Sequence, residues 1–589
     1  MIQSLKQFKT SFFLLSLMTL SLCANATDFT AVSNGNFSSS ATWLGGADPS
    51  TLLTTADNII INTGVTVNLD IDVTINNASA TIVLNGALSG AHNLTLQSGT
   101  LSGAGALVVH NYTVSAAGVS TFTGSTTADN LYNSAAALTL SAKTYITDTL
   151  GLILGTVTTA AGDTLTMLAN SVVHVANGTF VAGTAVIREL GTVNLLYTGT
   201  GTVSTGSEVA FPFINNVTVN LSSNSNQLSL SGNVTVTGAL NVQSGSLSIN
   251  GHTLTLNGTV ATSATGTLSG SLTSDISLGG SGSMGTLMFT SGSNTINNLT
   301  VNGSAASYAT LGSDLIVGGM LTLTNGGINL AGSSNLTLTG IDSIVGGSAN
   351  SYVATTGTGK LIINIIGGVL NNARMLPIGT AAGYAPVKVT NNGIAAGNFM
   401  ASVHPGIYAN GTTGSDLSAT YRSVNTSWEV SSDITTGANV TLETYWMTAM
   451  GVNSFNTSSV YLSHYTNGAW DDTTAAQATA HAGGMFSVSR SGITSFSPFA
   501  VFSNNPAGIA QVSAADAFSA YPNPAMNVLQ VSITNPQATN ELKVYDLLGN
   551  RVADYSVHGA SNTIDISALT SGVYFLSVNN TATQKFVKQ

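Results

Sequence analysis

Apolar and polar positions alternate in short runs through most of the chain. In a typical run, residues 335–339, Leu336 and Leu338 alternate with Asn and Thr, and Gly, Asn or Ser residues separate such runs from one another. Alternation with a period of two is the pattern of a β-strand that buries one face, and the separating residues favour turns. The pattern predicts an all-β chain built from many strands of three to five residues.

These runs recur in three similar segments. Residues 234–242 resemble residues 315–323, and a third copy surrounds Leu150. The leucines that the copies share are Leu150, Leu240 and Leu321, with spacings of 90 and 81 residues. A copy of this length has about six strand signals, and so many turns fit about four stacked coils of about 20 residues better than an independent sandwich.

We therefore expect residues 111–345 to form a right-handed parallel β-helix, a solenoid whose coils stack and bury a narrow apolar interior. A string of small β-sandwiches is the alternative that the strand pattern leaves open. The first coil needs a cover, because its backbone groups would otherwise remain unpaired. We expect residues 27–110 to form this cap and the first coils, with Trp43 as a plug. Residues 34–67 are similar to the start of G8-type domains.

The pattern changes after residue 345. Strand signals become longer, aromatic residues become frequent and the repeat is lost. We expect residues 346–506 to form a β-sandwich module that closes the solenoid. A linker is expected at residues 507–514, between this module and the C-terminal segment.

The N-terminus has the organisation of a secretory signal peptide. Two lysines precede an apolar stretch, residues 12–22, which is too short to span a bilayer. Ala24 and Ala26 supply the small residues that signal peptidase recognises, so residues 1–26 are predicted to be removed. Cys23 would allow a lipoprotein instead, but the leucine before it is bulky where a lipoprotein signal carries Gly or Ala. Cleavage after Ala26 leaves a mature chain without cysteine.

Four motifs follow one another in residues 515–589: Tyr-Pro-Asn-Pro, Asp-Leu-Leu-Gly-Asn between two apolar runs, Leu-Thr-Ser-Gly-Val-Tyr, and an end with two lysines. In this order they resemble the C-terminal sorting domain of Bacteroidota type IX secretion. The resemblance implies a small β-sandwich, the type IX machinery as partner, and export through the periplasm to the medium or the outer cell surface. An ordinary β-module is the alternative. The residues that carry the resemblance are Tyr521, Pro522, Asn523, Pro524, Asp546, Gly549, Leu569, Gly572, Tyr574, Lys585 and Lys588.

Composition limits the partners. Charged residues make up 6 % of the chain, against about 25 % in ordinary soluble domains. Binding to nucleic acid depends on clustered cations, so nucleic acid is not an expected partner. After residue 22 no apolar run has the length of a membrane span, and no transmembrane segment is expected in the mature chain. The basic residues between positions 27 and 506 are Lys143, Arg188, Lys360, Arg374, Lys388, Arg422 and Arg490.

Candidate metal and ligand groups are few. Asp70 and Asp72, with Asp57 nearby, could bind Ca²⁺ through carboxylate oxygens, but no loop with the spacing of a calcium site accompanies them. Asp471 and Asp472 could be ligands or sugar contacts, although the tip of a polar hairpin is the simpler interpretation. The eight histidines have no metal-ligand spacing. No metal or other cofactor is expected.

Enzymatic function has to be weighed, because polysaccharide lyases and hydrolases use β-helices. Their grooves need converging carboxylates or basic residues. Residues 112–340 contain only Lys143 and Arg188 as basic residues, and Asp148 and Asp163 miss the spacing of one coil. We therefore expect a non-catalytic surface or secreted protein, an adhesin or surface-binding stalk with a glycan or cell-surface ligand. A β-helix lyase or glycoside hydrolase is the alternative.

Overall fold

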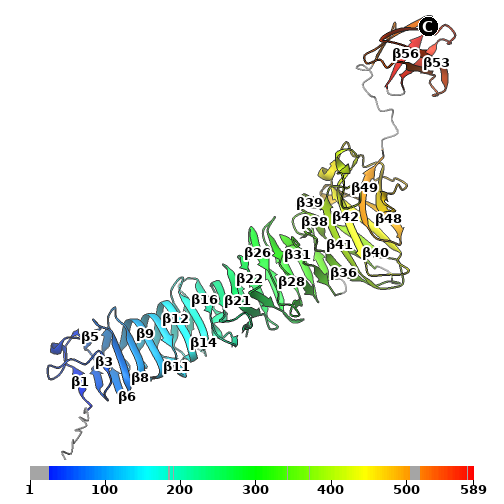
Figure 1. The fold of residues 1–589 in the computed structure, drawn as a ribbon. Coiled ribbons are helices and arrows are strands. Elements are labelled where there is room, and N and C mark those ends of the chain that lie inside the picture. The colour runs from blue at the N-terminus through cyan, green and yellow to red at the C-terminus, as the bar shows by residue number, and fades with distance from the viewer. Residues whose placement is uncertain are drawn as a thin grey trace, which may run out of the picture. The chain divides into compact units, whose positions relative to one another are not determined.

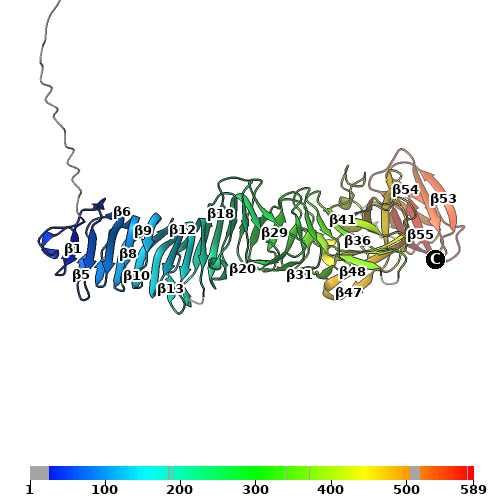
Figure 2. The same cartoon turned by 90° about the horizontal axis from the view of Figure 1, so that it is seen from below.

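The chain forms two compact units, residues 1–504 and residues 505–589. In the first unit, parallel strands lie side by side in a long stack that leads into antiparallel strands (Figures 1 and 2). Of the predicted signal peptide only Ala26 is described, and the predicted linker lies outside the described residues. The computed structural model describes residues 26–183, 186–189, 191–340, 343–369, 372–504, 518–579 and 582–589.

Residues 52–379 form a β-solenoid of about 15 turns. Each turn pairs in parallel with the next, so that equivalent residues form columns. In one column Val73, Leu94, Tyr112 and Leu131 are partners in successive turns, and all four side chains are buried. The stacked parallel pairs confirm the solenoid and exclude the string of separate sandwiches.

Strands of the first turns are longer than the three to five residues expected, because they continue around the corners of a turn. β12 (Lys143–Thr159) starts beside β13 (Thr164–Met167), continues beside β14 (Val172–Val181) and ends beside β11 (Ala137–Leu140). It therefore contributes to three successive faces. Other strands of the same 28-stranded sheet are β6 (Val73–Leu84), β8 (Leu94–Ser102), β9 (Ala106–Ser120), β10 (Ser125–Asn133), β18 (Ile214–Asn220) and β21 (Leu240–Ser248).

A second sheet covers another face of the solenoid and has six short parallel strands. They are β20 (Val234–Val236), β22 (Thr253–Leu256), β25 (Asp275–Leu278), β28 (Leu299–Asn302), β31 (Leu321–Asn325) and β34 (Ile344–Gly346). In each of the first five strands an outward polar residue lies between two buried apolar residues.

The repeat has a different phase from the one that the sequence suggests. Leu150 and Leu240 lie in one column, and the 90 residues between them are four turns. Leu321 lies instead in the six-stranded sheet, four turns after Val234. The expected equivalence of Leu240 and Leu321 is therefore wrong. Because every face has the same inward apolar and outward polar alternation, similar segments can occupy different faces.

The N-terminal cap is organised around Trp43. β1 (Asp28–Ala31) pairs in parallel with β4 (Asn58–Ile61), and the 3-10 helix η1 (Ser40–Thr42) leads into the tryptophan. Trp43 is 2 % exposed, donates from Nε1 to the Phe37 carbonyl at 2.9 Å and packs edge-on against the Phe37 ring. Trp43 is thus a core side chain of the cap, as expected.

The solenoid passes into the sandwich without a break in its sheets. β33 (Leu336–Leu338) pairs in parallel with β36 (Leu361–Ile365), whose other edge pairs antiparallel with β41 (Gly397–Pro405). On another face, β35 (Val353–Ala354) pairs in parallel with β38 (Ile378–Thr380). The parallel stack therefore extends beyond residue 345, where we expected the sandwich to begin. The strand β36 belongs to both parts.

Two sheets form the sandwich, and Trp428 and Trp446 are buried in a core that is continuous with the solenoid interior. The ten-stranded sheet also includes β27 (Thr295–Ile296), β30 (Leu315–Val317), β42 (Ser423–Ser432), β44 (Gly451–Val452), β45 (Val460–Thr466), β46 (Ala469–Trp470) and β49 (Pro498–Ser503). The five-stranded sheet consists of β37 (Ala373–Leu376), β40 (Val387–Asn391), β43 (Val440–Met447), β47 (Thr479–His481) and β48 (Met485–Ile493).

The second unit is a small antiparallel sandwich with its own core, which includes Leu529, Leu542, Ile564 and Phe586. Its three-stranded sheet consists of β50 (Phe518–Tyr521), β51 (Val528–Ile533) and β54 (Ser561–Asp565). Its four-stranded sheet consists of β53 (Arg551–Val557), β52 (Asn540–Tyr545), β55 (Gly572–Val578) and β56 (Ala582–Lys588).

Candidate functional site

The Tyr-Pro-Asn-Pro segment lies along the last strand of the chain. Asn523 donates from Nδ2 to the Lys585 carbonyl at 3.1 Å and accepts from the Val587 N–H at 2.9 Å. Pro522 and Pro524 have no N–H to donate. The Asn523 side chain therefore supplies the pairing to β56 that the backbone of the two prolines cannot make.

The Asp546 carboxylate organises the turn between β52 and β53. Its Oδ1 accepts from the N–H groups of Leu548 and Asn550, both at 2.9 Å, and its Oδ2 accepts from Asn550 Nδ2 at 3.0 Å. Gly549 has a φ of 83°, in the left-handed region that favours glycine. The hydrogen bonds, led by the one from the Asn550 side chain, lower the pKa of Asp546, so the carboxylate stays ionised.

The third motif packs an aromatic pair. The Tyr574 hydroxyl donates to the Thr570 carbonyl at 2.8 Å, and the Tyr574 ring stacks on Phe586 with centroids 5.7 Å apart. Leu569 packs against the core of the unit. Gly572 begins β55 just before this pair. The motif therefore closes the edge of the core at the point where β55 starts.

The sheet register brings the four motifs to one end of the unit. β52 and β55 pair beside the Asp546 turn, and Gly572 at the start of β55 pairs with Lys588 near the end of β56. Ala525 forms a parallel bridge with Lys588, which is 7 % exposed. Lys585 lies further back on β56 and is exposed. We call this part the motif end, and it comprises residues 521–528, 546–550, 566–572 and 586–589.

One small domain thus brings part of each of the four motifs to a single end. Residues 519–589 match the secretion system C-terminal sorting domain. The match confirms the expected type IX sorting domain, and it implies that the type IX secretion machinery handles the chain as a secreted or cell-surface protein. Comparison with curated proteins and with solved structures finds no match. Among the described residues, no helix is long and apolar enough to cross a membrane.

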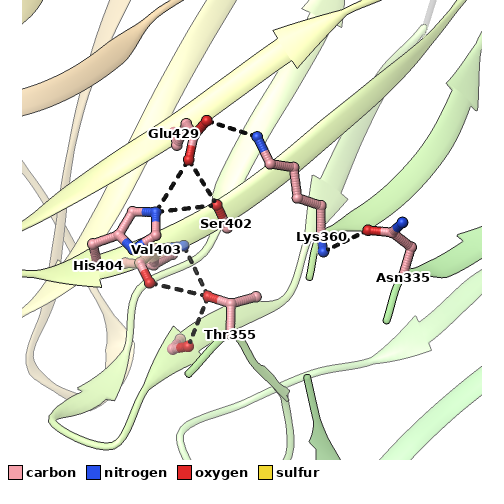
Figure 3. Close-up of polar contacts among 8 residues, drawn as sticks. Asn335, Thr355, Lys360, Ser402, Val403, His404 and Glu429 are labelled. Atoms are coloured by element: carbon pink, nitrogen blue, oxygen red, sulfur yellow. Dashed lines mark hydrogen bonds and ion pairs between the residues drawn. The ribbon is translucent and has the colours of Figure 1, made fainter. Parts of the chain in front are cut away.

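A polar cluster in the body contains side chains of the kinds used in nucleophilic catalysis. Ser402 and His404 on β41, Glu429 on β42 and Lys360 next to β36 meet where the solenoid joins the sandwich (Figure 3). Glu429 Oε1 accepts from Lys360 Nζ at 2.7 Å, and Oε2 lies 3.2 Å from His404 Nε2. Ser402 Oγ lies 3.4 Å from the same ring nitrogen.

This geometry does not fit a catalytic triad. In a triad the nucleophile contacts one ring nitrogen of the histidine and the carboxylate contacts the other. Here both groups contact Nε2 of His404, and Ser402 is 1 % exposed. The hydrogen bond from His404 and the contact with Lys360 lower the pKa of Glu429 to about 2. The cluster is therefore an ionic contact that joins β36, β41 and β42.

The acidic pair that follows Trp470 is engaged in contacts within the sandwich. Asp471 accepts two hydrogen bonds from the Arg490 guanidinium, at 2.8 and 2.7 Å. Asp472 accepts from the Tyr461 hydroxyl at 3.0 Å. The pair follows β46 rather than forming the tip of the β45–β46 hairpin, so the expected position at the tip is wrong. Asp471 thus forms a structural ion pair with Arg490, and Asp472 is held by a tyrosine hydroxyl.

The three aspartates considered for calcium have different partners. Asp70 accepts from the Ser38 hydroxyl at 2.5 Å, Asp72 accepts from the Asn93 N–H at 2.9 Å, and Asp57 accepts from the backbone at the start of the cap. Within the described ranges, no group of three or more His, Cys, Asp or Glu side chains is arranged to hold a metal ion.

The outer surface of the six-stranded sheet carries a column of hydroxyl groups. Thr235, Thr255, Ser277, Thr300 and Thr322 occupy equivalent positions in five successive strands, and we call them the hydroxyl column. A shallow hollow of about 380 Å³ lies along its last three members. The other polar residues and the methionine that line this hollow are Thr253, Asp275, Asn298 and Met320.

Two features are not predicted by the sequence patterns: the hydroxyl column and a buried carboxyl group. Glu208, in the 3-10 helix η2 (Ser207–Ala210), is fully buried in the solenoid. Its Oε1 accepts from the Tyr197 hydroxyl at 3.0 Å and the Gly206 N–H at 2.8 Å, while Oε2 has no hydrogen-bond partner among the residues that the structure describes. Burial raises the pKa of Glu208. A single glutamate within an otherwise uncharged stretch was the available signal.

Proposed function

We propose that the exported protein is a non-catalytic adhesin whose solenoid acts as a stalk and whose hydroxyl column binds a neutral glycan. The observation that supports this proposal is that each of five successive turns places a hydroxyl side chain, Thr or Ser, at the same position. A polysaccharide also repeats hydroxyl groups along its length, so donors and acceptors of the two can pair at several places. The sorting domain directs the chain to the outside, where such polymers occur.

Several weak contacts have to add up for this surface to bind. A neutral hydrogen bond contributes about 0.5–1.5 kcal/mol net, because water competes for each partner. On a rigid sheet the second and later contacts form within one complex, which raises the overall affinity.

The charge around the column favours a neutral ligand. The carboxylate beside it, Asp275, accepts hydrogen bonds from the Asn297 side chain and from both the side chain and the N–H of Asn298, at 2.9 to 3.1 Å. A charged polymer would find no clustered countercharge among the residues that line the hollow. Hydrogen bonding by neutral groups therefore remains the main source of recognition.

The test removes hydroxyl groups without changing side-chain shape. The variant replaces Thr255, Thr300 and Thr322 by Val in the mature full-length chain. The matched control replaces Thr74, Thr95 and Thr113 by Val, three equivalent half-buried residues of the 28-stranded sheet. We expect the first variant to lose about tenfold or more in affinity on a glycan array and in cell binding, from three lost hydrogen bonds. The control should bind like the wild type.

Equal binding by both variants would contradict the proposed site.

The alternative function, a β-helix polysaccharide lyase or glycoside hydrolase, predicts that the protein cleaves the polysaccharide that it binds. Incubation with a bound polysaccharide would then release shorter fragments, which chromatography of the supernatant detects. Fragment release by the wild-type protein would show that it is an enzyme and would contradict the proposed adhesin function.

A further inference from the structure

The motif end of the sorting domain carries an exposed apolar surface. Leu547 is 68 % exposed and Leu548 is 87 % exposed, at the tip of the β52–β53 turn. The large apolar side chains that the described residues of this unit expose are Tyr521, Met526, Val528, Leu547, Leu548 and Val552. All six lie within the motif end or directly beside it, whereas the strands away from it place their large apolar residues in the core.

The two leucines are held outward by an ordered turn. The Asp546 carboxylate accepts from the backbone N–H groups on both sides of Gly549, and the Asp546 N–H donates to the Asn550 carbonyl at 2.9 Å. A turn fixed in this way loses little conformational freedom when a partner covers it. The apolar pair is therefore presented in a form that suits docking.

We propose that Leu547 and Leu548 dock the folded sorting domain into an apolar pocket on a protein component of the type IX export machinery. The two leucines lie inside the segment that matches the sorting domain, at the end where all four motifs meet. The inference extends the sorting assignment to a specific contact and does not depend on glycan binding by the solenoid.

A protein pocket suits this surface better than a lipid surface. The ionised Asp546 carboxylate lies within the same turn, directly before the two leucines. An anionic membrane surface would repel this charge, and insertion into hydrocarbon would remove its water. A protein pocket can surround the leucines and leave the carboxylate in its existing hydrogen bonds.

The test uses the full-length chain in a host with an active type IX system. The variant L547S/L548S should reduce the fraction found on the cell surface and in the medium at least tenfold, with accumulation in the periplasm. The matched control is L272S/I394S, which changes two equally exposed apolar residues, 66 % and 90 %, in the first unit. It should be exported like the wild type. Wild-type export of L547S/L548S would overturn the proposal.

Two further measurements keep the outcome decisive. The variant L547M/L548M retains apolar side chains and should restore export, whereas a purely structural defect in the turn would affect both double variants. Purified full-length protein is also mixed with vesicles of anionic phospholipid and separated by flotation. If the wild type floats with the vesicles and L547S/L548S does not, the leucines bind a lipid surface. This result would overturn the proposed docking into a protein pocket.

Discussion

Two glutamates of the first unit have opposite environments. Glu208 is fully buried, one of its oxygens has no hydrogen-bond partner within the described part of the chain, and desolvation raises its pKa. Glu429 lies beside His404 and Lys360, and its pKa is lowered to about 2. A pKa that differs between the folded and unfolded chain makes stability depend on pH, and the two shifts give this dependence opposite signs.

Replacement of Glu208 by Gln should increase the free energy of unfolding at neutral pH. Above the ordinary value of 4.5, the unfolded chain ionises at this position while the folded chain keeps Glu208 neutral. The free energy of unfolding therefore falls as pH rises from 4.5 toward the raised pKa. We expect E208Q to match the wild type near about pH 4 and to exceed it at about pH 7, measured by urea unfolding. A variant with the wild-type pH slope would contradict this.

Replacement of Glu429 by Gln should weaken the junction between solenoid and sandwich. The stability that ionised Glu429 contributes is present above 4.5 and is lost as pH falls toward about 2. We expect E429Q to lose about 1.5–3 kcal/mol at neutral pH, the range for hydrogen bonds to charged groups, and to lose less stability than the wild type on acidification. The control, D129N at the half-exposed pair with His110, should cost below about 1 kcal/mol. Urea unfolding measures both, and equal losses would argue against the junction contact.

At the scale of the elements, side chains also connect successive turns. Asn111 Nδ2 donates to Asn93 Oδ1 at 2.7 Å, and Asn130 Nδ2 donates to Asn111 Oδ1 at 2.8 Å. The three asparagines occupy equivalent positions at one corner of the solenoid, and we call them the asparagine ladder. The ladder gives each amide a partner where the backbone changes direction.

Replacement of Asn111 by Ala should break the ladder in its middle. The change removes two hydrogen bonds and leaves the amide groups of Asn93 and Asn130 without their partner, at a cost of about 1–3 kcal/mol. The control T113V changes an outward residue two positions along the same strand and should stay within about 0.5 kcal/mol of the wild type. Urea unfolding of the mature chain provides the measurement. A loss for N111A no larger than for T113V would show that the ladder adds no stability.

The fold class could be predicted because alternation is a local property of the chain. Each short run, such as residues 335–339, indicates by itself a strand with one buried face. The face on which a strand lies depends on register over many turns, which local alternation does not determine, so the repeat wrongly predicts that Leu321 is equivalent to Leu240. The junction depends on contacts across 69 residues, between Lys360 and Glu429, that no local pattern contains.

The functional sites show the same division. The four sorting motifs could be recognised because each consists of neighbouring residues. Their convergence depends on the pairing of Gly572 with Lys588 and of Ala525 with Lys588, which only the folded sheet provides. The hydroxyl column likewise combines residues such as Thr255 and Thr300 that lie two turns apart.

At the scale of the whole molecule, the chain combines an exported body with a transport domain. The body has one continuous apolar core from Ala31 in the cap to Val501 in the sandwich. The sorting domain has a separate core. Each unit therefore buries an apolar core of its own, and removal of the sorting domain leaves the core of the body closed.

Deletion of residues 515–589 should stop export. The deletion removes the whole segment that matches the sorting domain, so the type IX machinery loses its recognition element. We expect the truncated protein to accumulate in the periplasm, as measured by cell fractionation and immunoblotting. Export at the wild-type level would contradict the role of the sorting domain. The variant L272S/I394S, which we expect to be exported like the wild type, controls for changes in the body.

The two cores should unfold in separate transitions. Because β36 belongs to both the solenoid and the sandwich, unfolding of the sandwich would expose the last turn of the solenoid, and the two parts should melt together. The sorting domain should give a second, smaller transition, since the enthalpy of unfolding scales with the number of residues. Calorimetry of the full-length and truncated chains tests this: truncation should remove the smaller transition and leave the midpoint of the larger one unchanged. A third transition would contradict this coupling if a variant in residues 397–503 abolished it. The sandwich would then unfold separately from the solenoid in spite of the shared strand.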